Sequence, residues 1–292
     1  MNPEGGDSEK SGLEGLKISS IRVYPIKSLG GAEMASARFS ARGFELDRRW
    51  MLADRNGRFL SQRDFPALAL MRVEPQSDSL SVTNPLGFSI DVPFIPNGEG
   101  AIEVSVWDDA ASGLTYSSAI DKFFSDYIGS DCRLVKIDDA VARPVEESFR
   151  VHPEDEVSFA DGFPFLIIGE SSLADLNARL ESDVAMDRFR PNIIFSGGEP
   201  FAEDGWARVR IGEHEFHVVK PCARCVMTTI DQETGAKGTE PLATLSTFRM
   251  SSASGKRRIL FGQNAIASGA SGMVRVGDPI ELLESKPIPT FD

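Results

Sequence analysis

Short runs of alternating apolar and polar residues, separated by turn-forming residues, constrain the fold of this chain more than any other feature. The segment "RRWMLADRNGRFLSQ" predicts two strands joined at Asn56-Gly57, because Asn-Gly readily adopts the left-handed backbone of a tight hairpin turn. The segment "SLSVTNPLGFSIDVPF" repeats the pattern around residues 84–87. Further predicted strands are "KISSIRVYPI", "AIEVSVWDD", "CRLVKI", "FPFLIIG", "PNIIFSG", "ARVRIGEHEFHVVK", "VMTTID" and "MVRVGDPIELLE".

Helical periodicity is confined to a few segments. Apolar residues recur at helical spacing over residues 119–128, and Gly129 is a natural helix stop. The segment "SSLADLNARLES" predicts a second helix, with Ser172 as its N-cap and Asp175 in its first turn, and "EPLATLSTF" predicts a short third one. These patterns together predict a mainly β protein with some helices, most simply β-barrels or sandwiches with packed helices.

The chain is long enough for two domains, at 292 residues. Residues 138–162 are acidic and lack periodicity, so they predict a long connection, and loops of that length are often functional. We place the boundary there, between a first domain at 17–143 and a second at 144–288, and leave open the alternative that the first strand joins the second barrel. The Gly-rich, acidic residues 1–16 contain no apolar run, and they predict a disordered tail rather than a signal peptide.

Charge and cysteine content exclude several classes of protein. With 31 basic and 44 acidic residues the net charge is −13, which is a poor basis for binding nucleic acid or an anionic membrane. Any anion site must therefore be a local cluster of Lys and Arg. No apolar run is long enough for a membrane helix, and three cysteines are too few for a disulfide framework. A cytoplasmic protein fits these observations.

The segment "KPCARCVMTTID" places two cysteines, Cys222 and Cys225, in a locally basic stretch. A zinc site would combine them with His214 and His217, but positions three apart on a strand face opposite sides. A dithiol redox pair normally stands at a helix N-terminus, whereas "VMTTID" predicts a strand. A single thiolate ligating a redox metal and two unremarkable thiols also remain open. The third cysteine, Cys132, is predicted to be a buried core thiol.

Seven motifs, in order along the chain, carry a family resemblance. They are "YPIKSLGG", "LDRRWML", "RFRPNIIF", "KPCARCVMTTID", "EPLATLSTFR", "LFGQNAIA" and "VRVGDPIELL". Together they resemble the MOSC proteins, the superfamily that includes the C-terminal domain of molybdenum cofactor sulfurase, and in particular the mitochondrial amidoxime-reducing component and its bacterial homologues. The resemblance covers about residues 17–285. It implies a MOSC β-barrel packed on an N-terminal β-barrel-like domain.

The resemblance also implies a cofactor site. The family binds the molybdenum cofactor, a pterin with a dithiolene and a phosphate, and one protein cysteine completes the sulfur ligation of the metal. The matching position here is Cys225. The residues that match the family's pterin and phosphate site are Lys27, Ser28, Arg48, Arg190 and Asn192. Their chemistry agrees, because Arg offers forked donors to phosphate, Lys a point charge, and Asn both a donor and an acceptor.

Further site residues follow from the same resemblance. Asp161 matches the family's acidic residue near the metal, where it would relay a proton. Ala223 and Arg224 flank the metal ligand, so their backbone amides are expected to reach the cofactor, and the Arg224 side chain to neutralise its charge. Arg63 is expected to extend the basic wall, and Cys222 to have a lesser role.

The function implied is reduction of N-hydroxylated compounds at molybdenum, with two electrons and two protons consumed and an amine and water released. No cysteine follows Cys225, so we expect no iron–sulfur cluster of its own and a separate flavin or iron–sulfur reductase as electron donor. No pyridoxal phosphate is expected. The alternatives are a non-catalytic cofactor carrier or sulfur-transfer module, and a thiol-redox protein that uses Cys222 and Cys225.

Overall fold

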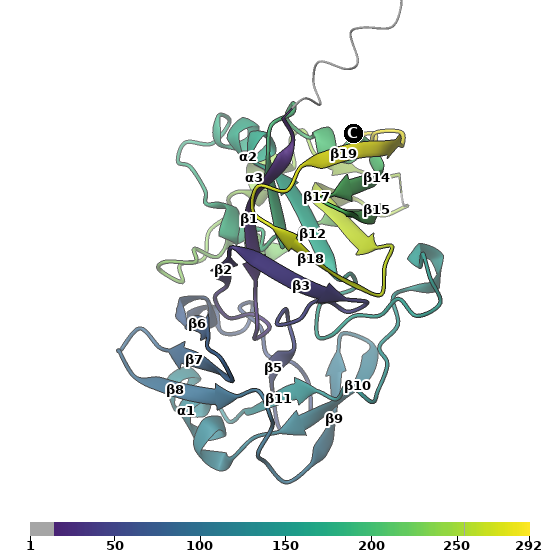
Figure 1. Cartoon of the computed structure of the whole chain (residues 1–292). Coiled ribbons are helices and arrows are strands. Elements are labelled where there is room, and N and C mark those ends of the chain that lie inside the picture. The colour runs from purple at the N-terminus through teal and green to yellow at the C-terminus, as the bar shows by residue number, and fades with distance from the viewer. Residues whose placement is uncertain (1–14, 254) are drawn as a thin grey trace, which may run out of the picture.

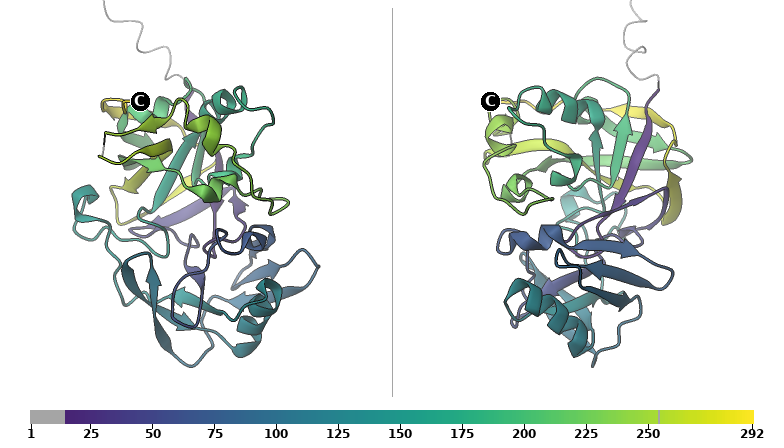
Figure 2. Two further views of the ribbon diagram at one scale, coloured as in Figure 1. Left: turned by 180° about the vertical axis from the view of Figure 1, so that it is seen from behind. Right: turned by 90° about the vertical axis from the view of Figure 1, so that its left-hand side faces the viewer.

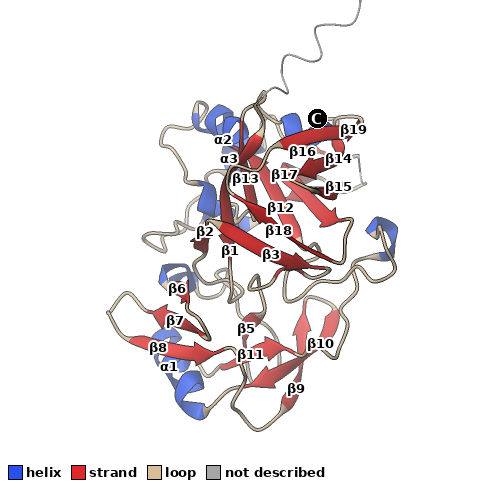
Figure 3. Cartoon of the chain, viewed as in Figure 1, coloured by secondary structure: helices blue, strands red, loops and turns tan. Residues whose placement is uncertain are grey.

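The computed structural model describes residues 15–253 and 255–292 of the chain. Figure 1 shows two bodies, an upper one that contains the C-terminal strands and a lower one that contains the strands between residues 50 and 137, and Figure 2 shows the same division from two further sides. Strands dominate both bodies (Figure 3). The predicted class, mainly β with some helices, is therefore confirmed.

The upper body is built on one large sheet. In spatial order its strands are β19 (Ile280–Ser285), β14 (Trp206–Ile211), β15 (His214–Ala223), β17 (Arg258–Ala267), β12 (Phe165–Gly169), β13 (Ile193–Ser196), β1 (Lys17–Val23) and β2 (Ala32–Met34), with β16 (Met250–Ser251) paired to β17. The β1 strand pairs antiparallel with β13, so the first strand belongs to the same sheet as the C-terminal strands. A smaller sheet joins β3 (Ser36–Ser40) to β18 (Ser271–Arg275) and β4 (Gly43–Phe44).

Aromatic rings fill the core of the upper body. Phe165 on β12 packs edge-to-face against Phe39, Phe44 and Phe216, with ring centroids 6.0, 5.1 and 5.3 Å away. All four side chains are at most 2% exposed. Leu16 is also buried in this core, so the prediction of a disordered tail over residues 1–16 is wrong for Leu16. Residues 1–14 of that tail lie outside the described chain.

The lower body contains two small sheets and one long helix. One sheet orders β5 (Trp50–Ala53), β11 (Arg133–Ile137), β10 (Asp109–Thr115) and β9 (Ala101–Val106); the other orders β6 (Arg72–Pro75), β7 (Ser79–Thr83) and β8 (Ser89–Pro93). The helix α1 (Ser118–Ile128) ends at Gly129, whose φ of 67° is left-handed, as predicted. Cys132 is 5% exposed in this core, which confirms the prediction of a buried thiol.

The remaining elements are short. They are the helices α2 (Glu170–Asn177) and α3 (Leu242–Leu245), and the 3-10 helices η1 (Pro66–Leu70), η2 (Glu147–Phe149), η3 (Met186–Arg188), η4 (Ala202–Gly205) and η5 (Val226–Thr229). One of them, η1, contributes Leu68 to the core of the lower body. The predicted connection over residues 138–162 contains η2 and otherwise no helix or paired strand within the described chain. Its last residues carry Asp161 to the junction of the two bodies.

Three local predictions are wrong. The segment after Asn56-Gly57 is not a strand, since its backbone forms only isolated bridges, through Arg58 and Phe59. Helix α2 begins after its N-cap Gly169, so Asp175 lies beyond the first turn. The hydroxyl of Ser172, the predicted N-cap, instead donates to the buried Glu203 carboxylate. The segment "VMTTID" is not a strand.

The course of that last segment is set by side-chain hydroxyls. Thr228 Oγ1 donates to the carbonyl of Cys225 at 2.9 Å, and Thr229 Oγ1 donates to the carbonyl of Val226 at 2.8 Å. These local bonds close the turn of η5, and they satisfy backbone groups that a strand would have paired with a neighbour. Cys225 therefore stands immediately before η5, past the end of β15.

Candidate cofactor and active site

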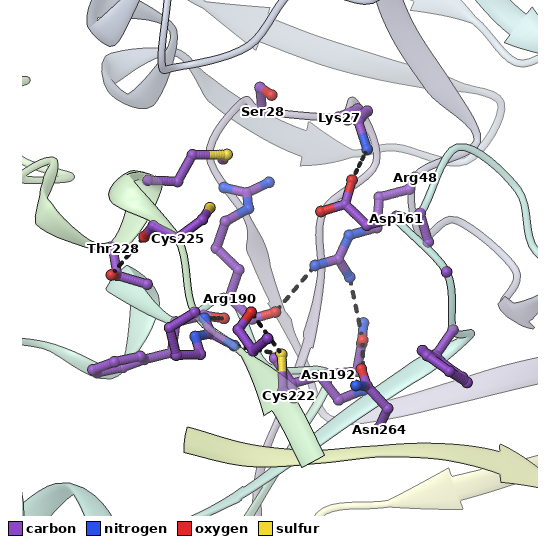
Figure 4. A pocket seen from close by; sticks show the side chains of 18 of the residues that line it. Lys27, Ser28, Arg48, Asp161, Arg190, Asn192, Cys222, Cys225, Thr228 and Asn264 are labelled. Atoms are coloured by element: carbon purple, nitrogen blue, oxygen red, sulfur yellow. Dashed lines mark hydrogen bonds and ion pairs between the residues drawn. The ribbon is translucent and has the colours of Figure 1, made fainter. Parts of the chain in front are cut away.

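One pocket lies at the junction of the two bodies, and every site residue predicted from the sequence lines it. These residues are Lys27, Ser28, Arg48, Arg63, Asp161, Arg190, Asn192, Ala223, Arg224 and Cys225. In Figure 4, Lys27, Arg48 and Asp161 lie on one side of the pocket, with Cys225 and Thr228 across from them. Residues nearly 200 positions apart in sequence thus face the same space.

The chain after β1 brings the first two of these residues to the junction. Beyond Val23 it turns at Pro25, and the Lys27 backbone N–H donates to the carbonyl of Trp50 at 2.7 Å. Gly30 is required in this turn, because a Cβ at that position would lie 2.6 Å from the carbonyl oxygen of Met71. Lys27 and Ser28 are consequently held between the upper sheet and the lower body.

Two guanidinium groups stack on one buried ring. The Arg190 and Arg48 guanidinium carbons lie 4.2 and 4.7 Å from the ring centroid of Tyr24, which is 1% exposed. Arg48 also donates to Asp47 at 2.7 Å, to the Asn192 side-chain oxygen at 3.2 Å and to the Arg190 carbonyl at 3.1 Å. The ring and these bonds fix two cations close together, which is the local cluster that an anion site requires.

The backbone around the pocket is strained. Five non-glycine residues of the described chain have positive φ, and four of them line the pocket or contact its wall. Those four are Ser28 (71°), Trp107 (57°), Arg190 (56°) and Arg48 (48°). Such conformations cost on the order of 1–3 kcal/mol each and concentrate at functional sites.

Several buried donors on the pocket wall lack a partner among the described residues. They are Ser28 Oγ, Arg190 Nη2 and Arg224 Nε. Burial, with a further contribution from the nearby charge of Arg48, lowers the pKa of Arg190 to about 10. A buried donor without a partner is costly, and a bound anion would satisfy these groups. The residues present therefore fit a phosphate-bearing, polar cofactor such as the molybdenum cofactor.

Lys27 and Asp161 form an ion pair inside the pocket. Lys27 Nζ donates to Asp161 Oδ1 at 2.5 Å and to the Phe159 carbonyl at 2.8 Å. Burial lowers the Lys27 pKa, and Asp161 partly offsets this. For Asp161, burial alone would raise the pKa, but the charge and hydrogen bond of Lys27 outweigh it and hold the pKa well below its usual range. Because 63% of the Asp161 side chain is exposed, solvent screens part of this attraction.

The two thiols of the C-x-x-C segment have different surroundings. Cys225 is exposed, and Arg63 Nη2 lies 3.6 Å from its sulfur. Cys222 is half-buried, and Arg224 Nη1 lies 2.9 Å from its sulfur. The Arg224 backbone N–H donates to the carbonyl of Ile259 at 2.8 Å, so that amide is not available to a cofactor in the pocket, contrary to the expectation. Ala223 ends β15 and lies on the pocket wall.

The structure offers no support for a zinc site. No group of three His, Cys, Asp or Glu residues able to hold a metal ion occurs in residues 15–253 and 255–292. His214 and His217 are half-buried residues of strand β15, and His214 Nε2 accepts the backbone N–H of Met273 at 3.3 Å.

Two residues of the site are not singled out by the sequence. Arg188 adds a further cation to the pocket lining, where it pairs with Asp231 at 2.6 Å. Trp107 donates from its indole N–H to Asp161 Oδ1 at 3.0 Å. The signal for Trp107 was present but faint: it is a bulky apolar residue at the end of a predicted strand, followed by two aspartates.

The pocket is lined by cations, contains an exposed thiol and lies between two strand-rich bodies. These features are those of a cofactor-binding β protein, and comparison with known proteins specifies the family. The model of the MOSC domain matches residues 154–281, and that of the MOSC N-terminal beta barrel domain matches residues 15–131. The chain belongs to the MOSC-domain family.

Named relatives cover nearly the whole chain. It is 32% identical to mitochondrial amidoxime-reducing component 1 of Homo sapiens, over 91% of this chain and 82% of that protein. It is 31% identical to molybdenum cofactor sulfurase of Oryza sativa subsp. japonica, over 88% of this chain but 33% of that protein. Among solved structures, YiiM from Geobacillus stearothermophilus aligns with a TM-score of 0.31 at 15% identity, over 63% of this chain and 72% of that chain.

Proposed function

We propose that this chain is a molybdenum-cofactor-dependent reductase of N-hydroxylated compounds. An N–OH group, two electrons and two protons would give N–H and water. The observation that carries the proposal is the pocket itself, where the exposed thiol of Cys225 shares one space with buried donors that lack partners in the described part of the chain. The similarity to mitochondrial amidoxime-reducing components over 91% of the chain supports the choice of reaction.

The protein's part in holding the cofactor follows from the contacts. Cys225 would ligate the metal through Sγ, and Arg63 beside it would favour the thiolate. The free donors of Ser28, Arg190 and Arg224 would take the phosphate and the polar edge of the pterin. When bound, the cofactor supplies the two-electron chemistry and the acceptor for the departing oxygen.

Asp161 would act on the substrate rather than on the cofactor. Its low pKa keeps the carboxyl ionised at neutral pH, so it accepts hydrogen bonds and does not start as a proton donor. Both protein hydrogen bonds, from Lys27 and Trp107, end on Oδ1. Oδ2 is then the atom suited to accept the O–H or N–H of a bound N-hydroxylated compound and to orient its N–O bond.

Electron supply and location are further parts of the proposal. We assign the electrons to a separate flavin or iron–sulfur reductase, and the protein to the cytoplasm. All three cysteines are free thiols, as expected in a reducing compartment. Within the described residues, no helix has the length and apolar character needed to cross a membrane.

The test is benzamidoxime reduction by chemically reduced protein made in a host that synthesises the cofactor. Wild-type protein should release benzamidine, and Cys225→Ser should lose more than tenfold of the activity together with its molybdenum. The matched control is Cys222→Ser, which makes the same substitution at the other cysteine of the motif and should retain the metal.

Two outcomes would replace the proposal with an alternative. Metal-loaded wild-type protein that never reduces benzamidoxime would favour a cofactor carrier or sulfur-transfer module, which the similarity to molybdenum cofactor sulfurase makes the second candidate. Equal loss of function in both cysteine variants, with no molybdenum in either, would favour a dithiol redox protein.

A further inference from the structure

Trp107 has an unusual position for a tryptophan. It stands in the turn between β9 and β10, where Val106 pairs with Asp109, and its φ is 57°. Two-residue hairpin turns of this kind favour Asn and Gly, because bulky side chains are strained at positive φ. Its exposure is 49%, whereas Trp50 and Trp206 are each 1% exposed. Neither turn formation nor core packing therefore explains a tryptophan here.

Contacts at the pocket hold the indole in place. Its N–H donates to Asp161 Oδ1 at 3.0 Å, and the Arg63 guanidinium carbon lies 4.4 Å from its ring centroid. Arg63 in turn lies 3.6 Å from the sulfur of Cys225. Phe59, a pocket-lining residue, packs edge-to-face against the indole at 5.2 Å. The ring thus belongs to a continuous wall that runs from the proposed metal ligand to the carboxylate proposed to orient the substrate.

We propose that Trp107 is the stacking surface for substrate, and that it selects planar, conjugated N-hydroxylated compounds over small aliphatic ones. This inference rests on the proposed function and deepens it. An aromatic amidoxime has a flat π-system joined to N–H and O–H donors. The flat part would stack on the exposed indole, while the donors reach the Asp161 carboxylate that the same indole holds through its N–H.

The arrangement also accounts for the strain. A bulky residue on left-handed backbone is strained, and such a residue is kept when the surrounding structure fixes it for another purpose. Asn at this position would relieve the strain, because its short side chain tolerates positive φ, but it would offer no ring. Trp107→Asn therefore removes the proposed surface without straining the hairpin, and Trp107→Phe keeps a ring while removing the N–H.

The kinetic test compares two substrates on the metal-loaded protein. Trp107→Asn should raise KM for benzamidoxime roughly five- to tenfold, the range expected for loss of one aromatic contact, and leave KM for acetamidoxime within about twofold. Trp107→Phe should restore most of the difference. The matched control is Phe88→Ala, which removes a 63% exposed aromatic ring next to the β7–β8 turn and should leave KM for both substrates unchanged. Equal changes in KM for both substrates in Trp107→Asn would overturn the inference.

A binding measurement separates this inference from the proposed function. Because the other two tryptophans are buried, quenching of tryptophan fluorescence by benzamidoxime or by unreactive benzamidine reports on Trp107. Wild-type protein should show saturable quenching, and Trp107→Phe should lose it. If no N-hydroxylated compound is ever reduced but the quenching is present, the proposed reaction fails and the stacking surface stands. If reduction occurs and neither ligand quenches, the stacking surface is refuted.

Discussion

The aromatic core of the upper body and the pocket at the junction differ in polarity, burial and backbone conformation. In the core, Phe165 and its neighbours are apolar, fully buried and carried by regular strands. In the pocket, the cations Arg48, which is half-buried, and Arg190, which is buried, stand on left-handed backbone. Arg190 also has a donor without a partner among the described residues. The core stabilises the fold, whereas the pocket costs stability unless a ligand is bound. This contrast supports the proposal that the pocket is the functional region, and it does so without the chain's resemblance to a family.

The largest expected effect comes from breaking the core. Phe165→Ala removes a ring that packs edge-to-face against three others and should lower the free energy of unfolding by about 3–5 kcal/mol. Urea unfolding monitored by circular dichroism measures the change. The molybdenum content of the folded fraction should stay unchanged. A loss of metal from folded protein would show that core and pocket are coupled.

A second prediction concerns pH and compares two carboxylates. Burial, only partly offset by hydrogen bonds from Gly169 and Ser172, raises the Glu203 pKa to about 7, whereas the Asp161 pKa is lowered. Between pH 4.5 and about 7, Glu203 keeps its proton in the folded state and loses it in the unfolded state. The free energy of unfolding should therefore fall as pH rises through this window, by about 3 kcal/mol for the fully buried Glu203.

The control for that prediction is Glu203→Gln, which should flatten the pH dependence between pH 4.5 and 7. The Asp161 contribution has the opposite sign, because a lowered pKa adds stability that is lost only as pH falls below the ordinary range of an aspartate. Asp161→Asn should therefore leave the slope in the Glu203 window unchanged. A slope that persists in Glu203→Gln would contradict the assignment.

The smallest expected change in stability tests the pocket itself. Arg190→Asn keeps a residue that tolerates positive φ, removes a buried cation and should raise the stability of cofactor-free protein by roughly 1 kcal/mol. The same variant should retain less than a tenth of the molybdenum, because the proposed charge-assisted contact between Arg190 and the cofactor phosphate would be lost. Thermal unfolding and elemental analysis of one sample measure both. Lower stability of the cofactor-free protein would show that Arg190 is structural.

Much of the core could be predicted from the sequence, because burial imposes simple patterns. The hairpin around residues 84–87, helix α1 with its stop at Gly129, and the buried Cys132 all follow from local periodicity and turn chemistry. The errors occurred where side chains redirect the backbone. The hydroxyls of Thr228 and Thr229 stabilise a 3-10 helix within "VMTTID". The Ser172 hydroxyl donates to a buried glutamate instead of capping the helix.

The site is a different case. No local pattern brings Lys27, Asp161 and Cys225 together, and only the family resemblance predicted that they share a pocket. The Lys27–Asp161 ion pair and the Trp107 contact depend on how the two bodies meet, so neither could be seen in the linear sequence. Their roles in catalysis stay predictions.

The central claim is that Cys225 ligates molybdenum within a pocket built for an anionic cofactor. Elemental analysis of protein from a host that makes the cofactor tests it most directly. We predict roughly one molybdenum per chain in the wild type and less than a tenth of that in Cys225→Ser, because a serine hydroxyl is a poor ligand for a soft metal site. Wild-type protein without molybdenum, or a Cys225→Ser variant that keeps the full amount, would contradict the claim.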